Sequence, residues 1–226
     1  MKKYISLLLK IVTVIAALYG TYLSILGKNG FMSNWNALLF FTIQSNLWIA
    51  GWFIYEGIFL FKKKKYDSKV VNILKLMFTV AISLTGIVFV FILAPTLPNP
   101  YKLNNVLTHV VVPLCAVIDL FVCADKMNLR KTDFIYCVIP PIYYVIFSAI
   151  GYINHWHFVG TLNYPYFFLN WGSPAGAIGF TKESPWMGPV WWIILLAVII
   201  VFVGFIYTLL IRLFAKLGKA KKASSR

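Results

Sequence analysis

Two short polar segments of this sequence hold the residue types that could cleave an ester. The first, residues 41–46 (FTIQSN), offers the hydroxyl of Thr42, and the second offers the imidazole of His109. An imidazole can remove the proton of a hydroxyl that attacks a carbonyl, and a nearby donor can hold the resulting oxyanion. Thr42 is therefore the candidate nucleophile and His109 the candidate base. Ordinary hydrogen bonding between membrane helices is the alternative use of both side chains.

Helical geometry sorts the polar residues that follow Thr42. At about 100° per residue, Ser45, Asn46 and the more distant Glu56 fall on the same face as Thr42. We expect Ser45 and Asn46 to orient the site or to donate to an oxyanion. Gln44 points elsewhere on the helix, and we keep it as a candidate binding residue of the same segment.

The elements that must position these residues are membrane helices. Hydrophobic residues make up 61% of the chain and charged residues only 12%, about half the charged share of a soluble domain. Apolar runs of about 20 residues can each cross a hydrocarbon core of about 30 Å, and in lipid such runs become α-helices. The sequence therefore predicts an all-α, polytopic membrane helical bundle, a single domain over residues 1–226. We expect about six transmembrane helices, at residues 5–26, 35–61, 70–94, 106–124, 134–153 and 189–214.

The distribution of basic residues predicts the orientation of the bundle. The net charge of +15 is concentrated in the termini and in alternate loops, with sixteen lysines and arginines on one side and Lys28, Lys102 and Lys182 on the other. By the positive-inside rule, both termini are cytoplasmic. We expect the basic tail to lie on anionic lipid headgroups, and we expect no nucleic acid partner. The sixteen are Lys2, Lys3, Lys62, Lys63, Lys64, Lys65, Lys69, Lys126, Arg130, Lys131, Arg212, Lys216, Lys219, Lys221, Lys222 and Arg226.

The first span could in principle be a signal peptide, because Lys2 and Lys3 precede its apolar run. Lys10 interrupts that run and no A-x-A site follows it, so we expect an uncleaved span. His155 and His157 lack a third ligand, and the three cysteines lack metal-ligand spacing. We therefore expect neither a metal nor another cofactor.

Ionisable residues within the spans form an inner layer, near the cytoplasmic helix ends. Lys10, Glu56, Lys75 and Asp119 each lie about 8 Å inside such an end. Two cations and two anions at one depth favour ion pairs between helices. A proton or ion path through Glu56, Lys75 and Asp119 is the alternative.

Thr42 and His109 belong to an outer layer. Thr42 lies about 10 Å and His109 about 5 Å from the outer helix ends, so their side chains can meet if the second and fourth spans are neighbours. Asp119 is about 15 Å below His109, too far to complete a triad, and we predict a dyad. The segment 154–188 is aromatic and rich in turns, and we expect it to form a partly buried cap over the outer mouth that admits an acyl chain from the outer leaflet. An interfacial belt of aromatic residues without further function is the alternative.

Three segments together resemble a known family. They are residues 41–46, the spacing His109-x3-Pro113-x5-Asp119, and residues 164–170 (YPYFFLN). They resemble the bacterial Pr-six-Pr integral membrane proteins, which are similar to the androgen-induced-gene-one/FAR-seventeen-a family of membrane threonine hydrolases. The resemblance implies a multi-pass protein of the bacterial plasma membrane that hydrolyses fatty-acyl esters with Thr42 and His109. It also makes Tyr164, Tyr166 and Asn170 candidate binding residues.

Three functions stay open at this point. The first is an intramembrane lipid-ester hydrolase whose partners are membrane lipids and a fatty-acyl ester substrate. The second is a small proton- or ion-coupled transporter, or a lipid- or solute-binding protein without catalysis. The third is a non-catalytic scaffold.

Overall fold

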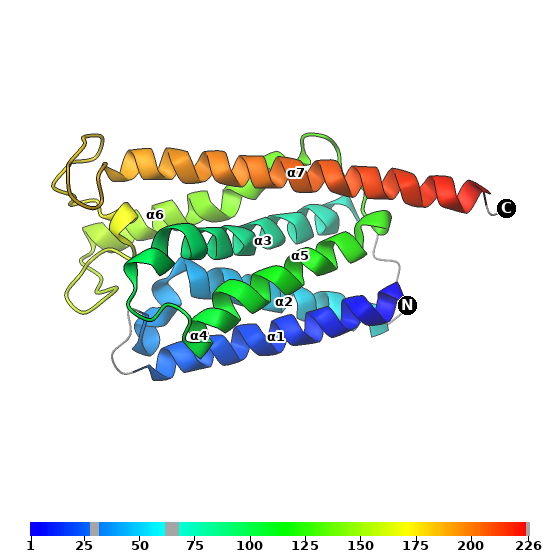
Figure 1. Ribbon diagram of the computed structural model, residues 1–226, viewed down its shortest axis with the longest axis horizontal. Coiled ribbons are helices and arrows are strands. Elements are labelled where there is room, and N and C mark those ends of the chain that lie inside the picture. The colour runs from blue at the N-terminus through cyan, green and yellow to red at the C-terminus, as the bar shows by residue number, and fades with distance from the viewer. Residues whose placement is uncertain (28–31, 62–67, 225–226) are drawn as a thin grey trace.

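Every named element of the chain is helical. The computed structural model describes residues 1–27, 32–61 and 68–224, and in these ranges extended pairing is limited to two isolated bridges in the cap. The helices lie side by side as a bundle (Figure 1). The predicted all-α bundle is confirmed. Its α-helices are α1 (Lys2–Leu26), α2 (Phe41–Phe61), α3 (Lys69–Val88), α4 (Leu103–Val106), α5 (Val112–Val122), α6 (Ile139–Ile153) and α7 (Pro189–Ser224).

Five helical segments of the described chain are long and apolar enough to cross a membrane: Lys2–Leu26, Lys69–Thr96, Leu103–Val122, Asp133–Ile153 and Pro189–Gly218. The predicted second span is not among them, although α2 is 21 residues long and lies within the bundle. Its polar residues, from Thr42 to Asn46 and again at Glu56, lower its hydropathy. The polar residues that are candidates for chemistry therefore interrupt the apolar run of α2.

The observed helices correct three predicted boundaries. The run 35–61 is not one helix, because a 3-10 helix, η1 (Asn34–Leu39), is separated from α2 by the extended residue Phe40, with φ −88° and ψ 140°. The ring of Phe40 is fully buried and meets the rings of Phe158 and Tyr166 edge-on. The fourth span begins earlier than predicted, at Leu103. The last helix continues to Ser224, because its tail is rich in the helix-favouring residues Ala, Lys and Leu.

The two basic ends of the chain lie at the same end of the bundle. The N-terminus and the C-terminus both lie there, whereas the cap lies at the opposite end (Figure 1). Lys2 pairs with Asp125 at 3.2 Å, and Arg212 donates to the carbonyl of Leu129 at 2.7 Å. Two termini at one end agree with an even number of crossings, and the cytoplasmic placement of that end stays a prediction. Lys28, Lys62 to Lys65 and Arg226 lie outside the described residues.

The inner layer is a closed network of buried charges. Lys10 lies 2.9 Å from Glu56 and 2.6 Å from Asp119, and Lys75 lies 3.1 Å and 2.6 Å from the same two carboxylates. Ser6 donates to the second oxygen of Asp119 at 2.5 Å. The predicted ion pairs are confirmed, and they join α1, α2, α3 and α5.

We expect Asp119→Asn to destabilise the bundle more than a surface carboxylate change does. Removing one partner of a buried ion pair costs about 3–5 kcal/mol, because the opposite charge stays buried without compensation. Thermal unfolding in detergent should therefore occur at a clearly lower temperature. Asp125→Asn is the control, because the side chains of Lys2 and Asp125 are 62% and 24% exposed and ion pairs near the surface contribute about 0–1 kcal/mol. Equal melting of the two variants would contradict a structural role.

Candidate functional site

Thr42 lies in the first turn of α2, directly after the break at Phe40. The first N–H groups of a helix have no partner in the preceding turn. The backbone N–H of Thr42 instead donates to the hydroxyl of Tyr166 at 3.3 Å, and the Thr42 hydroxyl lies 3.3 Å from the same oxygen. The break therefore leaves the N–H of Thr42 available beside the candidate nucleophile. In a continuous helix, this N–H would donate to a carbonyl of the preceding turn.

His109 lies in a π-helical turn, η4 (Leu107–Val111), between α4 and α5. Its Nδ1 is 3.1 Å from the carbonyl of Asn105 and 3.0 Å from the hydroxyl of Thr108. Thr108 donates its own proton to the carbonyl of Asn104 at 2.8 Å, so Nδ1 is the donor in both contacts. The neutral ring then carries its proton on Nδ1, and Nε2 is free to accept a proton.

The accepting nitrogen of His109 faces the hydroxyl of Thr42. Nε2 and Oγ1 are 3.3 Å apart, and both residues are buried. The second and fourth predicted spans are thus neighbours, as the pairing required. Asp119 belongs to the inner network, and His109 is oriented by a backbone carbonyl in place of a carboxylate. The arrangement is a hydroxyl–imidazole dyad.

The segment that continues α3 packs on the face of the His109 imidazole. The ring of Phe89 stacks on His109 with centroids 4.1 Å apart and planes 25° apart. Phe89 opens a second π-helical turn, η2 (Phe89–Leu93), so two such turns meet at the site. Turns of this kind are rare and occur frequently at functional sites. At Gly86, one turn earlier, a Cβ would lie 3.0 Å from the carbonyl oxygen of His109, so α3 and η4 are in close backbone contact.

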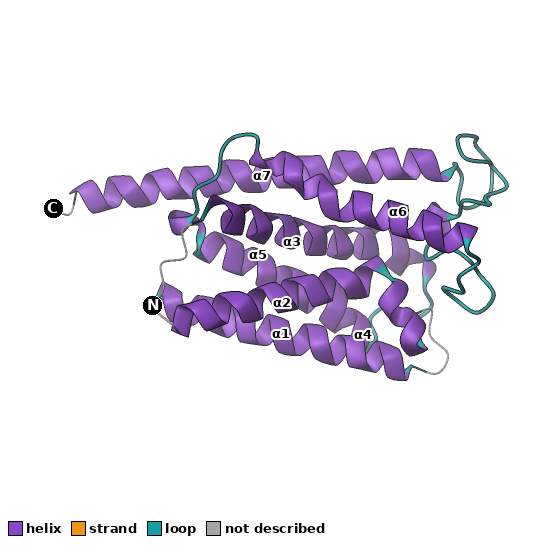
Figure 2. Cartoon of the chain, turned by 180° about the vertical axis from the view of Figure 1, so that it is seen from behind, coloured by secondary structure: helices purple, strands orange, loops and turns teal. Residues whose placement is uncertain are grey.

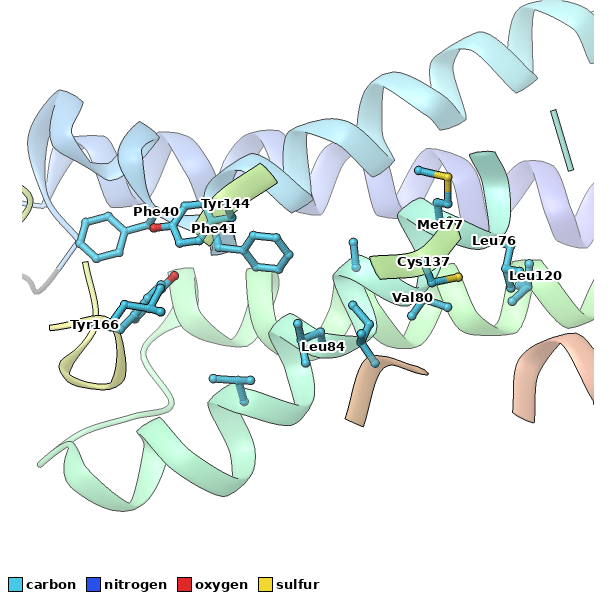
Figure 3. Close-up of a cluster of buried hydrophobic side chains, with 14 of the residues drawn as sticks. Phe40, Phe41, Leu76, Met77, Val80, Leu84, Leu120, Cys137, Tyr144 and Tyr166 are labelled. Carbon is cyan, nitrogen blue, oxygen red and sulfur yellow. The ribbon is translucent and has the colours of Figure 1, made fainter. Parts of the chain in front are cut away.

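Tyr166 brings the cap into the site. Its side chain lies beside Phe40, Phe41 and Tyr144, where the cap meets the start of α2 (Figure 3). Burial raises the pKa of Tyr166 to about 12, despite the hydrogen bonds with Thr42 that act in the opposite direction. The phenol therefore stays protonated at physiological pH and can act as a hydrogen-bond donor.

Ser45 and Asn46 support the first turn of α2. Ser45 donates to the carbonyl of Thr42 and lies 2.8 Å from the hydroxyl of Thr85 on α3. The amide of Asn46 donates to the carbonyl of Thr42 at 2.7 Å and to that of Thr108 at 3.1 Å. Both residues connect Thr42 with the neighbouring helices. Of the two roles expected from the sequence, this geometry matches orientation, since their donors point at backbone carbonyls.

The other predicted binding residues lie away from the dyad. Gln44 donates to the carbonyl of Leu38, outside the Thr42 stripe. Asn170 accepts from the backbone N–H of Gly172 and so closes a local turn of the cap. Tyr164 is half-buried in the cap and does not belong to the cavity wall described next.

An apolar cavity of about 290 Å³ begins at Thr42. Its walls come from α2, α3, α6, α7 and the cap. The polar residues among them are Thr42, Thr85, Tyr144 and Tyr166, while His109 does not line the cavity. The Thr42 hydroxyl therefore stands between an apolar space and a proton acceptor. The remaining wall residues are Phe41, Leu84, Val88, Leu93, Val138, Pro141, Ile142, Val145, Ile146, Phe168, Leu169, Ile193, Leu196, Ala197 and Ile200.

No family model, curated protein or solved structure matches this chain. The family resemblance thus rests on its three sequence segments alone. The contact between Thr42 and His109 is an observation of a different kind, because it follows from how the helices pack.

The packing at Gly86 predicts opposite effects of two glycine substitutions. A Cβ at Gly86 would meet His109 O at 3.0 Å and the Pro113 ring at 3.3 Å, so Gly86→Ala should destabilise by about 1–3 kcal/mol through overpacking. A Cβ at Gly51 on α2 would meet nothing within 4 Å, so Gly51→Ala should be neutral or stabilise by up to about 1 kcal/mol. Melting temperatures in one detergent compare the two. A wild-type melting temperature for Gly86→Ala would show that α3 and η4 have room to separate.

Proposed function

We propose that this protein is an intramembrane hydrolase that cleaves fatty-acyl esters with Thr42 as nucleophile and His109 as general base. The observation that carries the proposal is the 3.3 Å contact between Thr42 Oγ1 and His109 Nε2 at the wall of an apolar cavity. The apolar wall suits an acyl chain, and the dyad suits its ester carbonyl. Neither feature alone would favour this function over a structural hydrogen bond.

In the first half-reaction, the ester carbonyl approaches Thr42 from the cavity. Oγ1 attacks the carbonyl carbon while its proton passes to Nε2 of His109, and a tetrahedral oxyanion forms. Nδ1 keeps its proton on the carbonyl of Asn105, which stabilises the imidazolium and holds the orientation of the ring. The carbon–oxygen bond of the ester then breaks, and His109 returns the proton to the departing alcohol. The products are the free alcohol and an acyl group on Thr42.

In the second half-reaction, a water molecule repeats the sequence. His109 accepts a proton from the water as its oxygen attacks the acyl carbon. Collapse of this intermediate breaks the bond to Thr42, and the threonine oxygen regains its proton from His109. The fatty acid is released and the resting dyad is restored.

Two donors adjoin the place of the oxyanion. The phenol of Tyr166 lines the cavity and is protonated, and the backbone N–H of Thr42 is not used by the helix ladder. Donors held in place before the reaction stabilise a developing charge without reorganisation, and each contributes substantially in a site of low polarity. Ser45 and Asn46 act as positioning residues, because they hold the carbonyl of Thr42.

The setting of this activity follows from the expected topology. With the basic end of the bundle in the cytoplasm, the dyad lies in the outer half of the bilayer of a bacterial plasma membrane. The resemblance to membrane threonine hydrolases supports the same substrate class. The transporter alternative has less support, because Lys10, Glu56, Lys75 and Asp119 pair with one another and lie outside the cavity wall.

An alkyl fluorophosphonate should label the purified protein on Thr42. The threonine oxygen attacks phosphorus, fluoride leaves, and the proton passes to His109, so labelling requires both members of the dyad. Thr42→Ala and His109→Ala should abolish labelling, and Thr42→Ser should retain it. In-gel fluorescence and peptide mass spectrometry measure the adduct and its position.

Thr79→Val is the matched control for the loss of a buried threonine. Thr79 on α3 is buried, and its hydroxyl has no hydrogen-bond partner. Labelling of this variant should equal that of the wild type. Labelling that persists in Thr42→Ala would overturn the proposed nucleophile, and wild-type protein that stays unlabelled and inactive on esters would overturn the hydrolase.

Tyr166→Phe should lower kcat for ester hydrolysis by about 10²–10³-fold, the usual loss for one oxyanion donor. The raised pKa of Tyr166, about 12, means that the phenol stays neutral as the pH rises from 6 to 10, so this loss should be constant over that range. Kinetics on a short-chain ester at several pH values test this expectation. A loss confined to KM would instead assign Tyr166 to substrate binding.

A further inference from the structure

The cavity reaches the outer surface of the bundle between α6 and α7. Ile142 and Ile146 on α6 line the cavity, yet they are 53% and 55% exposed. Ala197 on α7 likewise lines the cavity and is exposed. Exposed residues that line the cavity from both helices place the rim of an opening between α6 and α7. Both helices belong to segments apolar enough to cross a membrane, so this opening faces lipid.

The opening has a closed inner end, where α7 touches the segment that leads into α6. A Cβ at Gly204 would lie 3.2 Å from the Sγ of Cys137, which belongs to the 3-10 helix η6 (Asp133–Val138). From this contact α6 slants away from α7 toward the cap (Figure 2). The two helices therefore form a wedge that widens toward the outer end.

The cap closes the wedge at its outer end. The rings of Phe167 and Phe168 lie 5.7 Å and 5.9 Å from the ring of Trp192 on α7. Tyr166, Phe168 and Leu169 are the buried residues by which this part of the cap packs on the bundle. The sequence predicted a cap over the outer mouth that admits an acyl chain from the outer leaflet. The structure covers that mouth with aromatic rings and leaves the side between α6 and α7 open.

The volume and chemistry of the cavity fit one hydrocarbon chain. Its volume of about 290 Å³ and its mainly apolar wall suit a hydrocarbon chain. Thr42 and Tyr166 provide hydroxyls where the cap meets α2, and apolar residues such as Leu84, Val145 and Leu196 form most of the wall. A chain longer than this space extends through the opening into the lipid.

We infer that a single acyl chain of a membrane-dissolved ester enters sideways between α6 and α7 and lies in this cavity with its carbonyl at Thr42. The placement of the carbonyl rests on the proposed function. The binding of the acyl chain in the cavity does not rest on it, because binding requires no reaction at Thr42. The two parts can therefore be tested separately.

The test uses Thr42→Ala protein in lipid nanodiscs and a fatty-acyl ester that carries a photoactivatable diazirine in mid-chain. After irradiation, mass spectrometry should place the adducts on peptides of α6 and α7 that contain the cavity wall. Ala197→Trp, added to Thr42→Ala, should reduce these adducts at least tenfold by filling the opening. Ile146→Trp on the opposite rim should have the same effect, and each variant is used only if its melting temperature matches that of the parent.

Val198→Trp is the matched control. Val198 neighbours Ala197 on α7 and is 61% exposed, but it does not line the cavity, so the same bulky residue there should leave the adducts unchanged. Adducts outside the cavity wall, or adducts equally strong in Ala197→Trp and Val198→Trp, would overturn the inference. A disulfide-linked dimer of Ala197→Cys protein, absent from the wild type, would identify a second copy of the chain as the occupant and would also overturn it. Failure of fluorophosphonate labelling with intact adducts would reject the hydrolase but keep the acyl site.

Discussion

The four-charge network of Lys10, Glu56, Lys75 and Asp119 is the interaction on which the geometry of the bundle depends. Its members come from α1, α2, α3 and α5, and each cation contacts both carboxylates. Charges in a low-dielectric interior tolerate little displacement, so the network fixes how far each helix extends along its neighbours. Thr42 lies about 21 Å outward from Glu56 along α2, and His109 about 15 Å outward from Asp119. The charge network near the inner end of the bundle thus sets the register of the helices. This register brings the Thr42 hydroxyl and the His109 imidazole together near the outer end.

The outer site departs from regular helical structure at Phe40, His109 and Phe89, and polar contacts with neighbouring elements accompany the first two. The break at Phe40 frees the N–H of Thr42, which Tyr166 accepts. The π-helical turn at His109 is joined to α2 by the amide of Asn46. Irregular backbone at membrane depth persists only where protein groups satisfy it. Polar residues near Thr42 are therefore required by the backbone as well as suited to chemistry.

The sequence was most informative where single residues carry strong physical penalties. Apolar runs gave the helices, and charges within those runs gave the inner layer, because a buried lysine or aspartate must find a partner. Depth and periodicity also brought Thr42 and His109 to one layer. The break at Phe40 was not predictable, since Leu38, Leu39 and Phe41 around it are equally apolar. Neither was the cavity, which depends on how four separate helices and the cap pack together. Tyr166 was identified only through a motif, because the periodicity of the sequence does not predict the path of a long loop.

The hydroxyl of Tyr166 has a consequence for the resting protein. Its oxygen lies 3.3 Å from both the N–H and the hydroxyl of Thr42, near the position that a substrate oxygen must occupy under the proposed mechanism. In the resting protein, the Tyr166 hydroxyl accepts the hydrogen bond that a substrate oxygen would accept. The backbone N–H of Thr42 is therefore kept aligned and satisfied in an apolar setting. On binding, the N–H of Thr42 would exchange one acceptor, the Tyr166 oxygen, for another, the substrate oxygen. The free energy of binding would depend on the difference between two similar hydrogen bonds, and affinity would come mainly from the hydrocarbon part of the ligand.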